Sequence, residues 1–132
     1  MKANEIRIGN WFKFIGKELP THILDNKIFQ WNTDCWNYEN EGGDILKNTK
    51  GISLTEDWVK RSKFKIFIDR PEIIIFNRRI ARYQILSISH DRIYNTFTVQ
   101  LLTKINSLAI KIKYVHQLQN FYFVMANREI KL

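Results

Sequence analysis

The sequence has little of the chemistry that stabilises secreted proteins or crosses membranes. It contains one cysteine, Cys35, so no internal disulfide can form and a reducing compartment fits best. No run of about 18 apolar residues occurs, so we expect no transmembrane helix and no membrane partner. The opening segment MKANEIRIGNW lacks the apolar core of a secretory signal. We therefore expect a cytoplasmic protein.

Motifs for catalysis and metal binding are also missing. The segment GKELPT lacks the second glycine and the Gly-Lys-Ser/Thr ending of a phosphate loop, and no Gly-x-Ser-x-Gly or Cys-x-x-Cys occurs. The three histidines lie far apart, and the acidic residues near Gly42-Gly43 do not have EF-hand spacing. We expect no catalytic residue, no metal and no cofactor. An enzyme whose groups converge from distant positions is the alternative.

What the chain does have is apolar residues and an uneven charge. Its 132 residues are 45% hydrophobic, which predicts a single domain, 1–132, with a substantial core. Residues 1–58 hold seven Lys/Arg and nine Asp/Glu, a net charge of −2, whereas residues 59–132 hold fourteen and four, a net charge of +10. The positive half indicates an anionic partner: a nucleotide, a nucleic acid or an acidic protein.

The first half of the chain predicts short strands and a loop. RIGNWFKFIG is typical of a turn at Gly9-Asn10 followed by a strand, and HILDNKIFQW is typical of a hairpin. Residues 31–52 are polar, acidic and glycine-bearing for much of their length, which predicts a long loop.

A short helix is predicted over 55–62. Thr55 can accept a capping hydrogen bond, with Ser53 as a competing cap, and acidic residues fill the first turn. Leu54 and Val59 have the spacing of a hydrophobic staple.

Residues 64–112 predict an antiparallel meander. EIIIFNRRIARYQILSI is long enough for one bent strand or for two strands joined near Asn77, and further turns are expected at 69–71 and 89–92. In a strand, Arg78 and Arg82 would share a face and Arg79 would point the other way.

The segment IKYVHQLQNFYFVMAN predicts a final helix over 114–126, ended by a left-handed Asn127. Its apolar stripe requires an apolar partner, so the expected fold is α+β: an antiparallel sheet with a short central helix and a C-terminal helix packed on it. Another side of this helix carries candidate ligand contacts: His116, Gln119, Asn120 and Phe123. The alternative is that the polar side chains face water or cap neighbouring strands.

Further candidate ligand-binding residues combine positive charge with aromatic rings. Arg78 and Arg82 suit bidentate phosphate contacts, Lys60 and Arg61 begin a second cluster, and Trp36 offers a stacking surface. Each also has a structural interpretation, as a solvated cation or a core aromatic.

Three segments in order, KANEIRIGNWF, ISLTEDWVKRSKF and IKYVHQLQNFYF, together resemble a family of short, largely uncharacterised phage and prophage proteins of gut bacteria. Members typically begin KANELRIGN, carry a PLTEEWLLKFGF-like segment and end near IKYVHQLQNLYFALTGEEL. The resemblance extends from Lys2 to Ile130. This sequence departs from the family at Lys63 and Asn127, which replace glycines at the ends of the two helices, so the first helix is expected to end differently.

The resemblance implies an accessory protein acting on a host component in the host cytoplasm. Three functions stay open. The first is non-enzymatic binding of an anionic host ligand, with a nucleotide signal favoured, as anti-defence sequestration. The second is DNA or RNA binding, and the third is protein–protein inhibition of a host enzyme. A homo-oligomer fits the first function, because a pocket for a sequestered ligand can form between copies, but nothing in the sequence requires one.

Overall fold

The computed structural model describes residues 10–14, 17–20, 49–105, 107–130 and 132. Its contacts divide the chain into two units, 1–52 and 53–132, and each is described by itself. The hairpin predicted at HILDNKIFQW and most of the loop predicted at 31–52 lie outside the described residues. The single domain stays a prediction.

The first unit contains a small antiparallel sheet. Its strands are β1 (Trp11–Phe14), β2 (Lys17–Pro20) and β3 (Thr49–Gly51), in the order β2-β1-β3. The strand predicted after Asn10 is confirmed as β1. The third strand, β3, falls within the range that the sequence predicted to be a loop.

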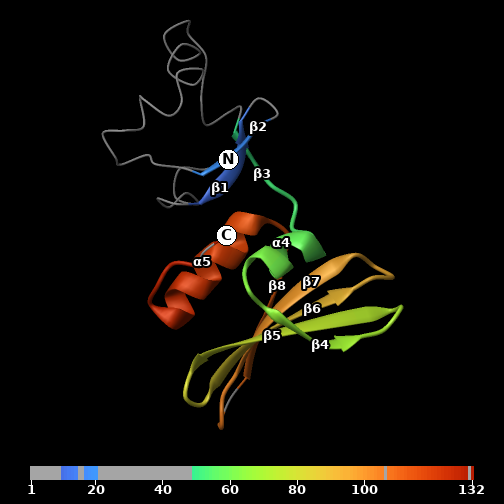
Figure 1. The fold of residues 1–132 in the computed structure, drawn as a ribbon, viewed down its shortest axis with the longest axis vertical. Coiled ribbons are helices and arrows are strands. Elements are labelled where there is room, and N and C mark those ends of the chain that lie inside the picture. The colour runs from blue at the N-terminus through green and yellow to red at the C-terminus, as the bar shows by residue number, and fades with distance from the viewer. Residues whose placement is uncertain (1–9, 15–16, 21–48, 106, 131) are drawn as a thin grey trace, which may run out of the picture. The chain divides into compact units, whose positions relative to one another are not determined.

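The second unit is a five-stranded antiparallel meander in chain order (Figure 1). The α+β class and the meander are confirmed, and the strands are β4 (Lys65–Asp69), β5 (Ile73–Ala81), β6 (Gln84–Asp91), β7 (Thr96–Leu102) and β8 (Ser107–Ile112).

Two predicted turns in this meander lie elsewhere. The chain does not turn near Asn77, which pairs with Ser87 inside the β5–β6 ladder, but at Arg82 and Tyr83. The strand β6 also continues through the predicted 89–92 turn as far as Asp91. The Asp91 carboxylate accepts the amide hydrogens of Ile93 and Tyr94 in the true turn, and Asn95 closes that turn at φ 52°.

The two predicted helices are confirmed as α4 (Glu56–Arg61) and α5 (Val115–Ala126). The Thr55 hydroxyl accepts a hydrogen bond from the Trp58 amide, so Thr55 rather than Ser53 is the cap. The Gln117 side chain reaches back to the Tyr114 amide at 3.1 Å at the start of α5, and Asn127 ends that helix at φ 54° as predicted. No helix among the described residues is long and apolar enough to cross a membrane.

The core lies between the helices and one face of the sheet, here called the inner face. Residues of the inner face alternate along each strand, as the two-residue period of a strand requires. Five of them are fully buried: Ile74, Phe76, Leu86, Ile88 and Val99. The stripe of α5 that packs on the sheet supplies Val115, Leu118 and Tyr122, each also fully buried. Burying an apolar side chain of this size contributes about 1.5–3 kcal/mol, so this layer is the main source of stability.

The α4 helix ends in a conformation that its sequence does not favour. Its C-cap is Ser62, and the next residue, Lys63, is left-handed at φ 62°. The helix therefore ends with the backbone geometry that glycine adopts readily, although a lysine stands there. A left-handed backbone costs a residue with a Cβ atom roughly 1–2 kcal/mol.

Replacing Lys63 with glycine should therefore stabilise the protein. We expect Lys63→Gly to raise the free energy of unfolding by about 0.5–1 kcal/mol in urea denaturation, less than the whole strain because glycine also loosens the unfolded chain. The matched control is Lys60→Gly inside α4, which should lower stability by a similar amount. If Lys63→Gly destabilises as much as Lys60→Gly does, the left-handed conformation carries no strain.

Candidate functional site

The structure gives Arg78 a position in the framework of the fold. Its Nη1 donates to the Ser62 carbonyl oxygen at 2.7 Å, and its guanidinium lies 4.9 Å from the centre of the Tyr122 ring. Arg78 therefore joins the end of α4 and the middle of α5 to the inner face of the sheet. This bond gives a hydrogen-bond donor to a carbonyl at the end of the helix, where no amide of the next turn is available.

The polar side of α5 is not open to solvent throughout. His116 and Gln119 are only 4% and 2% exposed, and the His116 ring stacks on Tyr114 at 5.6 Å between ring centres. Asn120 and Phe123 are half-buried. The alternative in which these side chains face water therefore does not hold for His116 and Gln119, which are buried on a side of the helix outside its apolar stripe.

The predicted cluster on α4 is exposed. Both Lys60 and Arg61 lie on the surface, and the Arg61 guanidinium stacks over the Trp58 ring at 4.0 Å from its centre. Trp36 lies outside the described residues.

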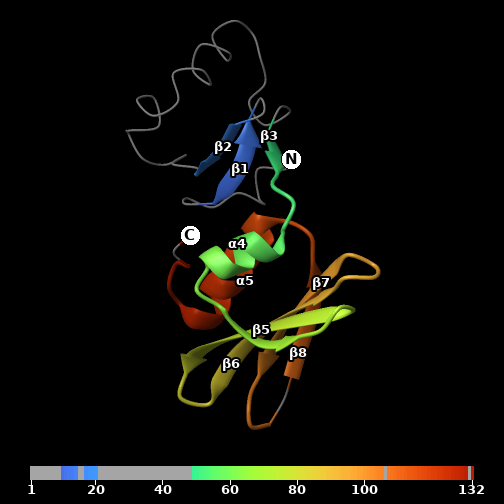
Figure 2. The ribbon, with the colours of Figure 1, turned by 45° about the vertical axis from the view of Figure 1, so that its right-hand side comes forward.

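Arg82 lies in the β5–β6 turn, not on β5. The strand ends at Ala81, with a shift in register after Arg79, so the prediction that Arg78 and Arg82 share a strand face is wrong. The turn lies beside the β7–β8 loop at the lower end of the sheet in Figures 1 and 2. There, Tyr83 has the Arg82 guanidinium 5.2 Å and the Lys104 ammonium 3.9 Å from its ring centre.

We call the group Arg79, Arg82, Tyr83 and Lys104 the basic end. All four are exposed, and Tyr83 keeps 52% of its surface accessible. Among the described residues, none of the three cations has an ion pair with a carboxylate. The sequence explains this, since Asp91 is the only acidic residue from 73 to 128. Within the described part of the chain, no ion pair therefore offsets the positive charge at this end.

The middle of the sheet face opposite the helices, here called the outer face, is mostly polar. Strand pairing lines up two rows across it: Asn77–Ser87–Gln100–Ala109 and Ile75–Ser89–Thr98–Lys111. Lys65 pairs with Asn77 at the β4 edge, and Lys111 stands at the β8 edge. Hydroxyls and amides thus occupy the middle of this face, and cations stand at both of its sides.

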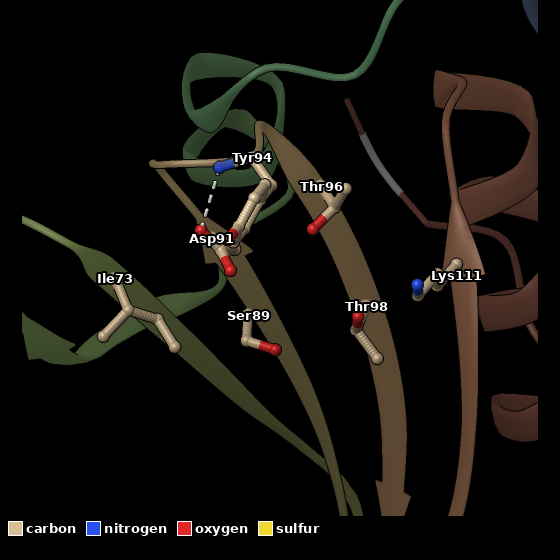
Figure 3. Close-up of a pocket in the computed structure, with 7 residues that line it drawn as sticks. All are labelled: Ile73, Ser89, Asp91, Tyr94, Thr96, Thr98 and Lys111. Atoms are coloured by element: carbon tan, nitrogen blue, oxygen red, sulfur yellow. Dashed lines mark hydrogen bonds between the residues drawn. The ribbon is translucent and has the colours of Figure 1, made fainter.

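The outer face is hollowed at the end away from the basic end. The hollow has a volume of about 540 Å³, and the side chains that line it come from β5, β6, the β6–β7 turn, β7 and β8 (Figure 3): Ile73, Ser89, Asp91, Tyr94, Thr96, Thr98 and Lys111. None of the ligand-binding residues predicted from the sequence lines it. The two-residue spacing of Ser87 and Ser89 and of Thr96 and Thr98 indicates one polar face on each strand, but only the pairing of the strands brings these faces together.

On the helix side of this same end, one arginine joins three segments. Arg92 donates to both Glu56 carboxylate oxygens, with Nη2 2.7 Å from Oε1 and Nε 3.1 Å from Oε2. Its Nη1 donates to the Asp69 carboxylate at 2.9 Å and to the Arg70 carbonyl at 2.7 Å. Arg92 therefore fastens the start of α4 and the β4–β5 turn to the β6–β7 turn.

His90 completes this group, which we call the Arg92 network. Its Nδ1 lies 2.7 Å from Glu56 Oε2 and its Nε2 lies 2.8 Å from Asn95 Oδ1, so each ring nitrogen faces an oxygen. The ring also stacks on Phe97 at 4.1 Å. Hydrogen bonds from Arg92, with the help of His90 and against partial burial, lower the pKa of Glu56 from 4.5 to about 2. Glu56 and Asp69 in turn raise the pKa of Arg92.

Comparisons of the chain with protein-family models, with curated proteins and with solved structures find no match. The chemistry of the site is therefore argued from its own residues. Among the described residues, no three His, Cys, Asp or Glu side chains are grouped as metal ligands.

The lowered pKa of Glu56 predicts how stability responds to acid. The ionised carboxylate stabilises the fold above pH 4.5, and this contribution is lost as the pH falls through the folded pKa of about 2. Since the side chain is 21% exposed and water screens the pair, we expect Glu56→Gln to cost roughly 1–2 kcal/mol at pH 7. The difference from the wild type should shrink as the pH drops from 4.5 toward 2 in urea denaturation.

The matched control is Asp57→Asn, one position along the same helix turn. Asp57 is exposed, and the structure records no ion pair for it among the described residues. Its loss should cost less stability at pH 7 than Glu56→Gln does, because it removes no recorded ion pair. A stability difference for Glu56→Gln that is the same at pH 7 and pH 2 would show that the Arg92 network does not respond to protonation of this carboxylate.

Proposed function

We propose that this chain is a non-enzymatic binding protein for an anionic ligand, and that the ligand is a single-stranded nucleic acid. The observation that carries the proposal is the basic end, where two cations lie near an exposed tyrosine ring and have no recorded ion pair among the described residues. Proteins that bind single strands without strong sequence preference combine cations for the phosphates with aromatic rings for the bases.

Each residue of the basic end has a distinct part in this proposal. Arg82 and Lys104 neutralise phosphates, and displacement of counterions drives that contact. Tyr83 stacks on a base through the part of its ring that stays accessible. Arg79, exposed on the outer face, continues the positive charge toward the middle of the sheet.

The spread of the cations favours a strand over a single nucleotide. From the basic end, positive charge continues along the β4 side of the outer face to Lys65, beside the amide of Asn77 and the hydroxyl of Ser87. A pocket for one nucleotide would instead bring several arginines together around the phosphate. The sequence made Arg78 a candidate for such a phosphate contact. In the structure, Arg78 extends from the inner face of the sheet and donates a hydrogen bond to the Ser62 carbonyl oxygen.

The resemblance to phage proteins adds a biological setting to this proposal. A small phage protein that covers single-stranded nucleic acid could shield it from host enzymes. The anti-defence role and the phage origin are supported by that resemblance alone, and sequestration of a nucleotide signal is the competing outcome of the test below.

The basic end should dominate the affinity for oligonucleotides. We expect the double variant Arg82→Ala/Lys104→Ala to weaken binding of a labelled single-stranded oligonucleotide at least tenfold in fluorescence anisotropy. The slope of log affinity against log salt should fall by about 1.4, because each lost phosphate contact on a single strand contributes about 0.7. Tyr83→Ala should weaken binding about tenfold and leave that slope unchanged, since stacking contributes about 1–3 kcal/mol per base.

The matched control is Lys60→Ala/Arg61→Ala, which removes the same charge from the exposed surface of α4. It should weaken binding less than threefold. An equal loss in both double variants would show that net charge, and not the basic end, determines affinity. Absence of oligonucleotide binding, or tight binding of a mononucleotide or cyclic nucleotide that survives the Arg82→Ala/Lys104→Ala change, would overturn the proposal.

A further inference from the structure

The hollow on the outer face is not explained by nucleic-acid binding at the basic end. It lies at the opposite end of the sheet and contains a carboxylate, Asp91, that would repel phosphate. Its volume of about 540 Å³ falls within the range of small-molecule sites. All of its lining residues belong to the second unit and are among those that the structure describes.

Most polar groups of the hollow have hydrogen-bonding capacity left. Among the described residues, no side-chain hydrogen bond is recorded for Ser89, Thr96, Thr98 or Lys111. One carboxylate oxygen of Asp91, Oδ1, accepts from the amides of Ile93 and Tyr94, which leaves Oδ2 available. Hydroxyls both donate and accept, a carboxylate accepts and an ammonium donates, so the hollow offers a mixed set of partners.

Tyr94 supplies the flat apolar surface. It is 78% exposed, and its backbone amide is fixed by Asp91 at 3.1 Å, so the ring stands at the rim of the hollow beside that carboxylate (Figure 3). An aromatic ring next to donors and acceptors suits a ligand with an apolar ring face and polar groups around its edge.

These features narrow the chemical class of ligand. Asp91 is the only carboxylate among the lining residues, and one carboxylate with hydroxyl groups provides too few oxygen ligands for a calcium or magnesium ion. The charges of Asp91 and Lys111 cancel, which favours a neutral ligand over an anion. The polar side chains of the lining would lose hydrogen bonds to water beneath a purely apolar ligand.

We propose that the hollow binds a neutral ring that carries neighbouring hydroxyl groups. A sugar and the ribose of a nucleoside share this chemistry. The ring face lies against Tyr94, one ligand hydroxyl donates to Asp91 Oδ2, and the remaining hydroxyls exchange hydrogen bonds with Ser89, Thr96 and Thr98. Lys111 donates to a ligand oxygen from the β8 side. This site is independent of the basic end and does not rest on the proposed function.

The test is a titration of the ¹⁵N-labelled full chain followed by amide chemical shifts. The ligands are methyl ribofuranoside, methyl glucopyranoside, cytidine and 2′-deoxycytidine, so that free sugars and nucleosides are compared directly. We expect saturable shifts at the amides of Ser89, Thr96, Thr98 and Lys111, with a dissociation constant of roughly 0.05–5 mM for at least one ligand. If the nucleoside binds, its 2′-deoxy form should bind at least fivefold more weakly.

Two variants test the assigned contacts without large changes to the fold. Thr98→Val removes one hydroxyl at nearly constant shape, and Asp91→Asn keeps an oxygen for the turn while removing the charged acceptor. Each should weaken binding at least fivefold, with thermal unfolding used to verify that the variants fold. The control is Ser107→Ala, which removes a hydroxyl from the same strand as Lys111 at the other end of the outer face and should change nothing.

The inference is overturned if no ligand of the panel gives saturable shifts at the hollow, or if Thr98→Val, Asp91→Asn and the wild type bind equally. Equal binding of cytidine and 2′-deoxycytidine would also overturn recognition of the hydroxyl pair. Because the ligands are neutral, the Arg82→Ala/Lys104→Ala variant should bind them as the wild type does. A failure of nucleic-acid binding is thereby distinguished from a failure of this site.

Discussion

The position of α4 depends on two arginines that extend from the sheet. Arg92 holds Glu56 at the start of the helix, and Arg78 holds the Ser62 carbonyl at its end. A helix of six residues is too short to be stable in water by itself. The free-energy cost of nucleating the helix exceeds the stabilisation from its few hydrogen bonds. The two arginines therefore hold the helix in place, and with it the buried side chains of Trp58 and Val59.

The same arrangement separates the charges of the second unit. Glu56, Asp69 and Asp91 all lie at the end that carries the Arg92 network and the hollow. Glu56 and Asp69 form ion pairs with Arg92. At the opposite end of the meander, no ion pair with a carboxylate is recorded for Arg82 or Lys104 within the described part of the chain. The fold thus creates one end that is internally neutralised and one that attracts anions. The proposed functions of the two ends follow this division, with a neutral ligand at one and a polyanion at the other.

Local chemistry in the sequence predicted the helices well. The cap at Thr55, the acidic first turn of α4 and the left-handed Asn127 after α5 each act within one helix turn, so neighbouring residues determine them. The β5–β6 turn at Arg82 and Tyr83 has no glycine, proline, asparagine or aspartate. Its position is set by the pairing of β5 with β6, which no local signal records.

The site was predicted only in part, because the roles of identical residues depend on the strand geometry. Arg78, Arg79 and Arg82 lie within five positions, yet one bonds α4, one faces outward and one lies in a turn. Strand alternation separates the first two, and a register shift removes the third. His116 and Gln119 are polar in sequence but buried in the fold, where packing overrides the preference of a polar side chain for water. The hollow requires four strands in register, a relation that a single sequence does not contain.

The segregation of charge along the meander also has a kinetic consequence. With Glu56, Asp69 and Asp91 at one end of the meander and Arg82 and Lys104 at the other, these five charges have an electric dipole moment along the sheet. In the field of a polyanion such a molecule turns so that Tyr83 and its neighbouring cations arrive first, which raises the fraction of productive collisions. The orienting force acts over roughly a Debye length, about 10 Å at 0.1 M salt. The association rate would therefore depend on ionic strength, even though the contacts in the final complex are short-range.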